Sequence, residues 1–528
     1  MLFTTFGFVL FLAALLPAYA AAPRRFRWAV LLAGSTAFYA FAGPVFLLYI
    51  LSATALAYCS ALAVSRLFAE RDALLAKEGG AAGKKALKLL FRKRAKKAAG
   101  AGIFAVLAIL ATVKYADFAL SGAGALLGLG ADAGGFMRFA LPMGISFYTF
   151  QTVGYLIDVY REKARAERNP LRLALFVSFF PQVVQGPISR FGELSKTLYD
   201  GARPSLASIS RGGQRVLWGF FKKLVIADRL WPALAHLAGH PDEFRGAYYL
   251  LAIGLYAVIL FCDFTGGIDI AIGAAEMFGV RLPENFNRPF YSKSIQEYWQ
   301  RWHMTMYSWF RDYVFYPVSA SGKMLRLGRL ARRALGDGAG KRVPVHLSLL
   351  WVWFLTGLWH GAAWHFIAWG LANGLAIMVS MELRPLYARF HGRFGRLCAT
   401  GAYRGFQIFR TFWLMNFIRS FDIYEGVLAT LGLMGSVFTG FGLSAFLENG
   451  LAPLGLPAAD YFAAGTGLLV VFFASYLSRD GADFRDRLAD PFPWQLRHLF
   501  FGLVFFMTLV LGAYGFGYDA RQFIYNQF

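Results

Sequence analysis

Three polar clusters interrupt an otherwise apolar chain, and each holds side chains that can accept or donate a proton. Two carboxylates end an apolar run in the segment Asp263–Asp269. A histidine lies among tryptophans in Ser294–Pro317, and another lies between glycines in Leu355–His365. Because a polar group inside a bilayer costs about 2.5–3.5 kcal/mol, each cluster is a candidate functional site.

The carboxylates of Asp263 and Asp269 are separated by six residues. At 100° per residue, this spacing leaves the two side chains about 120° apart around a regular helix. A shared acid–base role is therefore weakly supported, and hydrogen bonding within the fold is favoured for one or both groups.

The segment Ser294–Pro317 reads as one amphipathic helix. Helical spacing predicts a polar stripe of Glu297, Arg301, Thr305, Ser308 and Asp312, opposite a stripe rich in tryptophan. Glu297 and Arg301 form an i,i+4 pair in the favourable order. His303 lies nearer the aromatic stripe, so spacing alone favours a packed histidine bonded to a buried partner over a catalytic one.

The third cluster centres on His360. Gly357 and Gly361 free the backbone around it and allow another group to approach. A neutral imidazole in such a cavity could accept a proton. His365 lies about 140° further around a helix, so the two histidines would not face the same side. Spacing alone leaves a core histidine and a catalytic base equally supported.

The rest of the chain must place these clusters in a membrane. Of 528 residues, 57% are hydrophobic and only 16% are charged, yet the net charge is +24. This balance excludes an ordinary soluble domain and predicts an all-α, polytopic transmembrane protein with basic cytoplasmic loops. Nucleic-acid binding requires a continuous polar basic surface, which this composition does not support. The three cysteines lie far apart with no metal-binding spacing, so neither a disulfide framework nor a metal site is predicted.

Charge distribution predicts the orientation. Four stretches carry +22 of the net charge, and we expect all four on the cytoplasmic side: Ser65–Ala98, Arg161–Arg172, Ser319–Val343 and Met381–Arg410. Leu2–Ala22 is predicted to be a first span whose N-terminus lies outside. Pro344–Met381 joins two cytoplasmic stretches, so it should form a hairpin with His360 near its middle. The short, proline-interrupted segment Leu173–Ser189 is predicted to be re-entrant.

Several motifs in this order resemble the membrane-bound O-acyltransferase family, and within it the bacterial branch that O-acetylates exported polysaccharides such as alginate. The likeness covers nearly the whole chain, here treated as one multi-pass domain over 1–528. The motifs that carry it are Leu141–Gln151, Pro181–Ile188, Asp263–Asp269, Pro283–Asn287, Arg301–His303, Trp309–Tyr313, Gly357–Gly361 and the terminal Gln522–Phe528.

The resemblance implies a fold in which re-entrant segments surround a central funnel, and it implies two catalytic residues. His360 corresponds to the family's essential histidine, and His303 corresponds to a second polar position of the family. Substrate binding is expected from residues of the same motifs: Trp302, Arg301, Asp312, Trp359 and Asp269.

By resemblance, the protein would transfer an acetyl group from a cytoplasmic donor, acetyl-CoA, to hydroxyls of an exported cell-surface polysaccharide. The acceptor could also be an extracytoplasmic partner protein that completes the transfer. We expect a multi-pass protein of the inner cell membrane. The open alternatives are D-alanyl transfer to teichoic acid, a membrane transporter, and a non-catalytic subunit that retains the fold.

Overall fold

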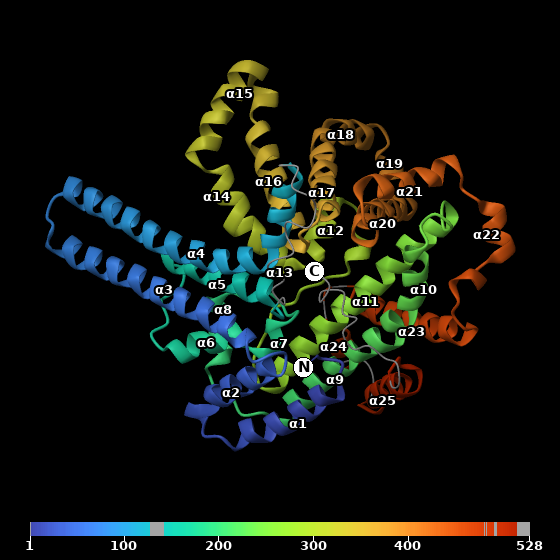
Figure 1. Cartoon of the computed structure of the whole chain (residues 1–528), viewed down its shortest axis with the longest axis horizontal. Helices are drawn as coiled ribbons and strands as arrows, with labels where there is room; N and C mark the ends of the chain where they lie inside the picture. Colours follow the sequence, from blue (N-terminus) through green and yellow to red (C-terminus); the bar gives the residue numbers. More distant parts are fainter. Residues whose placement is uncertain (1, 127–141, 480, 482, 490–493, 515–528) are drawn as a thin grey trace. The chain divides into compact units, whose positions relative to one another are not determined.

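A computed structural model describes residues 2–126, 142–479, 481, 483–489 and 494–514 (Figure 1). Its elements are helices, and the only β-pairing in these ranges is an isolated antiparallel bridge between Phe286 and Trp302. This confirms the predicted all-α class. The terminal motif Gln522–Phe528 and the start of the motif at Leu141 lie outside the described residues.

The chain divides into two compact units. Unit 1 comprises Met1–Val216 and Ile270–Pro283, and unit 2 comprises Leu217–Asp269 and Glu284–Phe528. The helices before residue 221 are α1 (Phe6–Ala21), η1 (Arg24–Phe26), α2 (Arg27–Ala40), α3 (Phe46–Lys77), α4 (Ala81–Leu126), α5 (Ile145–Tyr160), α6 (Pro170–Ser178), α7 (Phe180–Val183), α8 (Phe191–Leu198) and α9 (Leu206–Phe220).

The remaining helices begin with η3 (Phe221–Ala227), which is a π-helix. They continue with α10 (Asp228–Gly239), α11 (Ala247–Met277), η4 (Pro289–Tyr291), α12 (Ile295–Arg301), α13 (Met304–Phe310), η5 (Arg311–Phe315), α14 (Tyr316–Ser319), α15 (Gly322–Gly340), α16 (Val343–His360), α17 (Trp364–Glu382), α18 (Arg384–Arg393), α19 (Gly395–Cys398), α20 (Gly401–Ile423), α21 (Val427–Thr439), α22 (Leu443–Asn449), η6 (Ala452–Leu454), α23 (Ala458–Leu477), α24 (Phe484–Ala489) and α25 (Trp494–Leu511).

Six of the described helices are long and apolar enough to cross a membrane: α3, α4, α11, α16, α17 and α23. The helices α21 and α22 together would make a seventh span, but they meet at a 91° bend. The first apolar run, Leu2–Ala22, forms a shorter helix than the membrane span predicted for it. Helix α1 has 16 residues, or about 24 Å at 1.5 Å per residue, which is shorter than the roughly 30 Å hydrocarbon core of a bilayer.

The first predicted cytoplasmic stretch, Ser65–Ala98, lies in a helical hairpin of unit 1 formed by α3 and α4 (Figure 1). The two helices pack closely at Gly102, where an added Cβ would lie 2.5 Å from the Cβ of Ser60. The hairpin is joined to the loop after α5 by a bidentate pair between Arg71 and Glu162, with N···O distances of 2.9 and 2.7 Å. The Arg71 guanidinium holds the pKa of the Glu162 carboxyl below its ordinary value.

The segment Leu173–Ser189 does not form a single helix. Helix α6 ends at Ser178, α7 occupies only four residues, and the chain from there to Ser189 is non-helical and buried. Such irregular backbone at membrane depth is tolerated where protein covers it. The geometry fits the predicted re-entrant element, and the return to the cytoplasmic side stays a prediction.

Candidate active site

The hairpin predicted for Pro344–Met381 is present in unit 2. Helix α16 ends at His360, three residues turn the chain, and α17 begins at Trp364. Two glycines allow the helices to touch. An added Cβ at Gly370 would lie 2.3 Å from the Trp353 carbonyl oxygen and 3.0 Å from the Gly357 Cα. Gly357 and Gly370 therefore allow α16 and α17 to pack closely, and His360 lies next to the turn that joins the two helices.

The imidazole of His360 lies in an aromatic environment. Its ring centroid is 4.2 Å from that of Trp369 and 5.0 Å from that of Trp359. The residue is 8% exposed. His360 is one of the residues that line a pocket, and both of its ring nitrogens are shielded from water.

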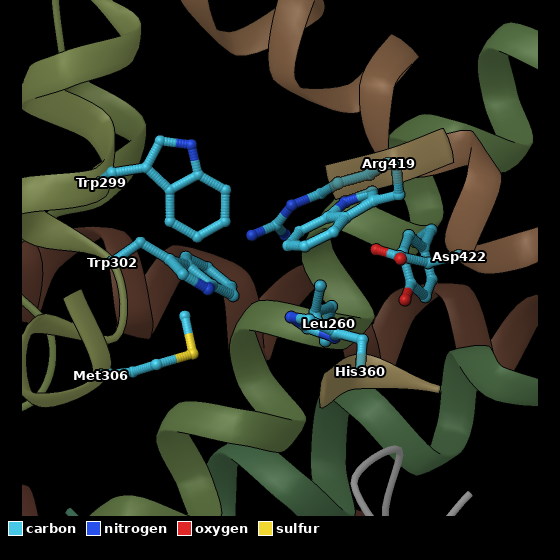
Figure 2. A pocket seen from close by; sticks show the side chains of 9 residues that line it. Leu260, Trp299, Trp302, Met306, His360, Arg419 and Asp422 are labelled. Atoms are coloured by element: carbon cyan, nitrogen blue, oxygen red, sulfur yellow. The ribbon is translucent and has the colours of Figure 1, made fainter. Parts of the chain in front are cut away.

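The pocket is assembled from helices that are far apart in the sequence. Its lining comprises Tyr256 and Leu260 of α11, Trp299 of α12, Trp302, Met306 of α13, His360 of α16, Trp369 of α17, and Arg419 and Asp422 of α20. In Figure 2, Trp299, Trp302 and Met306 approach from one side, and Arg419 and Asp422 approach from the opposite side. An apolar, tryptophan-rich wall with a few converging polar groups is typical of a ligand site.

The segment Ser294–Pro317 is not the continuous amphipathic helix that we predicted. It is broken between α12 and α13 at Trp302 and His303, and His303 has a left-handed φ of 47°. The cause is a competing segment. Asn287 N–H donates to the Arg301 carbonyl and Met304 N–H donates to the Asn285 carbonyl. The stripe is therefore interrupted after Arg301, and the break turns Trp302 into the pocket.

His303 itself is fully buried beside this break. Its Nδ1 lies 3.2 Å from Asn285 Oδ1, which also accepts hydrogen bonds from the backbone N–H and the hydroxyl of Thr305. The ring contacts Phe264 and Trp359 edge-on or tilted, with centroids 4.9 and 6.1 Å apart. This is the packed histidine with a buried partner that spacing favoured. His303 is absent from the pocket lining, and Trp359 lies between it and His360 along this chain of ring contacts.

The predicted substrate-binding residues occupy different places. Trp302 lines the pocket, and Trp359 packs against His360. Arg301 pairs with Glu297 at 2.6 Å, as the i,i+4 spacing predicted, whereas Asp312 pairs with its neighbour Arg311 at 2.8 Å. Arg301 and Asp312 are not among the residues that line the pocket.

Asp263 and Asp269 bind two different lysines of the π-helix η3. Lys223 lies 2.6 Å from Asp263 and 2.5 Å from Asp228, and Lys222 lies 2.6 Å from Asp269. The Lys222 ammonium also donates to the Thr265 hydroxyl. The wide angular separation of the two carboxylates along α11 therefore corresponds to two separate ion pairs, in agreement with the structural role that spacing favoured.

Two pocket residues, Arg419 and Asp422, were not predicted as site residues. The signal available in the sequence was an arginine and an aspartate inside the apolar run from Phe412 to Ile423. Among the described residues, no cluster of three His, Cys, Asp or Glu side chains could hold a metal ion.

The chain is similar in sequence to several known proteins. A sequence model of the membrane-bound O-acyltransferase family matches residues 161–331. The chain is 33% identical to a probable alginate O-acetylase AlgI of Azotobacter vinelandii over 376 residues, which cover 71% of this chain and 67% of that protein. It is 31% identical to a peptidoglycan O-acetyltransferase of Helicobacter pylori, over 55% of this chain and 56% of that protein.

A third relative has a different acyl group in its name. The chain is 32% identical to a teichoic acid D-alanyltransferase of Bacillus subtilis, over 44% of this chain and 57% of that protein. Acyl transfer is common to all these names, and the longest of the three matches is to the alginate O-acetylase. The chain therefore belongs to the membrane-bound O-acyltransferase family, in its alginate O-acetylase-like branch, and is a multi-pass membrane O-acyltransferase.

Proposed function

We propose that this protein transfers an acetyl group from acetyl-CoA, bound from the cytoplasm, to a hydroxyl of an exported cell-surface polysaccharide. The observation that carries the proposal is the imidazole of His360 at the edge of a tryptophan-walled pocket. The names of the alginate and peptidoglycan O-acetylating relatives support acetyl as the group transferred. An extracytoplasmic partner protein that receives the acetyl group first is compatible with the same chemistry.

In this mechanism His360 is the general base. It takes the proton of the acceptor hydroxyl as the hydroxyl oxygen attacks the acyl carbonyl carbon of the thioester. The tetrahedral intermediate then collapses, the carbon–sulfur bond breaks, and the imidazolium returns its proton to the leaving thiolate. Trp299, Trp302 and Trp369 shield the pocket from water, which limits hydrolysis of the thioester and strengthens electrostatic interactions.

His303 would act as a positioning residue rather than a second base. It is tied to Asn285 and packs against Trp359, which in turn packs against His360. These contacts support both the chain break that presents Trp302 and the end of α16.

The proposed orientation follows the basic segments. Ser65–Ala98 and Ser319–Val343 would face the cytoplasm, the N-terminus would lie outside, and the protein would reside in the inner membrane. Basic cytoplasmic surfaces would attract the phosphates of CoA as well as anionic lipid.

Loss of the chain should remove ester-linked acetate from the cell-surface polysaccharide. Cells lacking the protein, and the same cells complemented with it, would be compared by NMR of the purified polymers for ester-linked acetate and ester-linked D-alanine. Loss and recovery of D-alanine alone would instead support the teichoic acid alternative. Unchanged levels of both esters would contradict acyl transfer to these polymers. Inside-out vesicles should use added radiolabelled acetyl-CoA, whereas sealed right-side-out vesicles should not.

Substitution of Gly370 by leucine should reduce acetyl transfer by about 10- to 100-fold. The new side chain would force α16 away from α17, and overpacking of this kind costs about 1–3 kcal/mol. A displacement of His360 by about 1 Å can lower a rate by 10²-fold. Polymer acetate would be normalised to the amount of protein in the membrane. Gly465→Leu on α23 is the matched control, because nothing lies within 4 Å of an added Cβ there. Equal activities of the two variants would contradict the close-packing argument.

A further inference from the structure

The mechanism above leaves one buried cation of the pocket without a role. Arg419 is 2% exposed and lies on α20, in unit 2 with the other pocket residues. Figure 2 shows its guanidinium pointing toward Trp299 and Trp302, across the pocket from the backbone of α20. A charged group with so little access to water requires compensation from its surroundings.

Aromatic rings provide part of that compensation. The guanidinium carbon lies 3.9 Å from the ring centroid of Trp302 and 5.4 Å from that of Tyr298. A cation–π contact of this kind uses the faces of the guanidinium and leaves its N–H groups, which lie in the plane, available. Trp302 therefore holds the guanidinium in a fixed position within the pocket.

The N–H edges of Arg419 are not satisfied. Within the part of the chain that the structure describes, neither Nε nor Nη1 has a hydrogen-bond partner. A buried donor without an acceptor costs about 1–3 kcal/mol, and more when it is charged. Such an orphaned, rigidly held donor pair is suited to bind an oxygen that enters the pocket with a ligand.

The neighbouring carboxylate restricts which oxygen this can be. Asp422 lines the same pocket, and its Oδ1 has no hydrogen-bond partner within the described ranges. One cation and one carboxylate in one pocket give little net attraction for a permanent anion, such as a phosphate or a substrate carboxylate. They suit a neutral carbonyl whose oxygen becomes negative only during the reaction.

We propose that Arg419 is a further catalytic residue, which donates hydrogen bonds to the acyl carbonyl oxygen and stabilises the oxyanion of the tetrahedral intermediate. This inference rests on the proposed role of His360 as the base. As the acceptor oxygen bonds to the carbonyl carbon, the π electron pair moves to the carbonyl oxygen, opposite Arg419. When the carbon–sulfur bond breaks, the pair returns, the thiolate departs with the proton from His360, and Arg419 is unchanged.

The test compares Arg419→Met, Arg419→Lys and Arg419→Ala in proteoliposomes supplied with acetyl-CoA and a soluble glycan acceptor. Methionine preserves length and apolar packing but removes every donor. Loss of one oxyanion donor costs about 10²–10³-fold in kcat, and we expect Arg419→Met to show this loss with the KM for acetyl-CoA unchanged. Lysine retains one charged donor and should lie between Met and the wild type.

Chemical rescue separates catalysis from folding. Added guanidinium should restore a measurable part of the activity of Arg419→Ala and none of that of His360→Ala. Arg410→Met is the matched control, since Arg410 lies on the same helix, is exposed, and donates a hydrogen bond to the Lys293 carbonyl outside the pocket.

Three results would overturn the proposal. Wild-type kcat in Arg419→Met would show that the guanidinium is not needed, and a rise in KM alone would show that it binds a ground-state anion. If Arg419→Met fails to reach the membrane, the activity of Arg419→Lys and the guanidinium rescue of Arg419→Ala test the proposal instead. Absence of rescue in a folded Arg419→Ala protein also contradicts the proposal. Activity in His360→Ala would instead refute the proposed function itself.

Discussion

Replacement of His360 by glutamine is expected to lower polymer acetylation by about 10²–10⁴-fold, the range that a general base contributes. Glutamine has a similar volume and can form hydrogen bonds, but it cannot take a proton from the acceptor hydroxyl. Since His360 is packed between Trp359 and Trp369, the substitution should leave the pocket walls in place. The measurement is ester-linked acetate on the polymer, normalised to membrane protein.

The matched control for this experiment is His391→Gln. His391 is exposed on α18, and its Nε2 lies 3.0 Å from the Tyr403 hydroxyl. That variant should acetylate at the wild-type rate. Normal acetylation by His360→Gln, at a normal protein level, would refute the assignment of His360 as the base.

Replacement of Lys223 by methionine is expected to prevent stable folding of unit 2. Lys223 is 1% exposed, and its ammonium compensates Asp228 and Asp263 at distances of 2.5 and 2.6 Å. Removal of one partner of a buried ion pair costs about 3–5 kcal/mol, because the remaining charge is left without compensation. Here two carboxylates would lose the same cation. The measurement is the amount of monodisperse protein after extraction and its melting temperature in detergent.

A charge-neutral variant tests the reason for this loss. Combining Lys223→Met with Asp228→Asn and Asp263→Asn removes all three charges and should recover part of the stability. Lys341→Met is the surface control, since its pair with Asp337 is exposed on both sides and such pairs contribute little. A stable Lys223→Met protein, or no recovery in the triple variant, would contradict the electrostatic explanation.

Local pattern predicted a large part of this molecule. Composition and charge predicted a helical membrane protein, because apolar helices satisfy their backbone hydrogen bonds in lipid. The i,i+4 spacing predicted the pair of Glu297 with Arg301. Glycines around His360, together with the basic segments on both sides, predicted a hairpin with this histidine at its turn. Each of these inferences depends only on residues close together in the chain.

The predictions that were wrong or missing concern contacts between segments that are far apart in the sequence. Spacing predicted one helix through His303, but the helix breaks there, where Asn285 Oδ1 accepts a hydrogen bond from the Thr305 N–H and lies 3.2 Å from His303 Nδ1. The angle between Asp263 and Asp269 indicated separate roles, but their lysine partners lie 40 and 47 residues earlier in the chain.

Arg419 and Asp422 join the pocket only because α20 packs against α12 and α17, whose pocket residues Trp299 and Trp369 lie 50 or more residues earlier in the sequence. The sequence by itself determined the class of the fold, the helical hairpin and its histidine. The tertiary structure decided which polar groups share a pocket with that histidine, because hydrophobic periodicity specifies the face of a helix that is buried and not the partner that buries it.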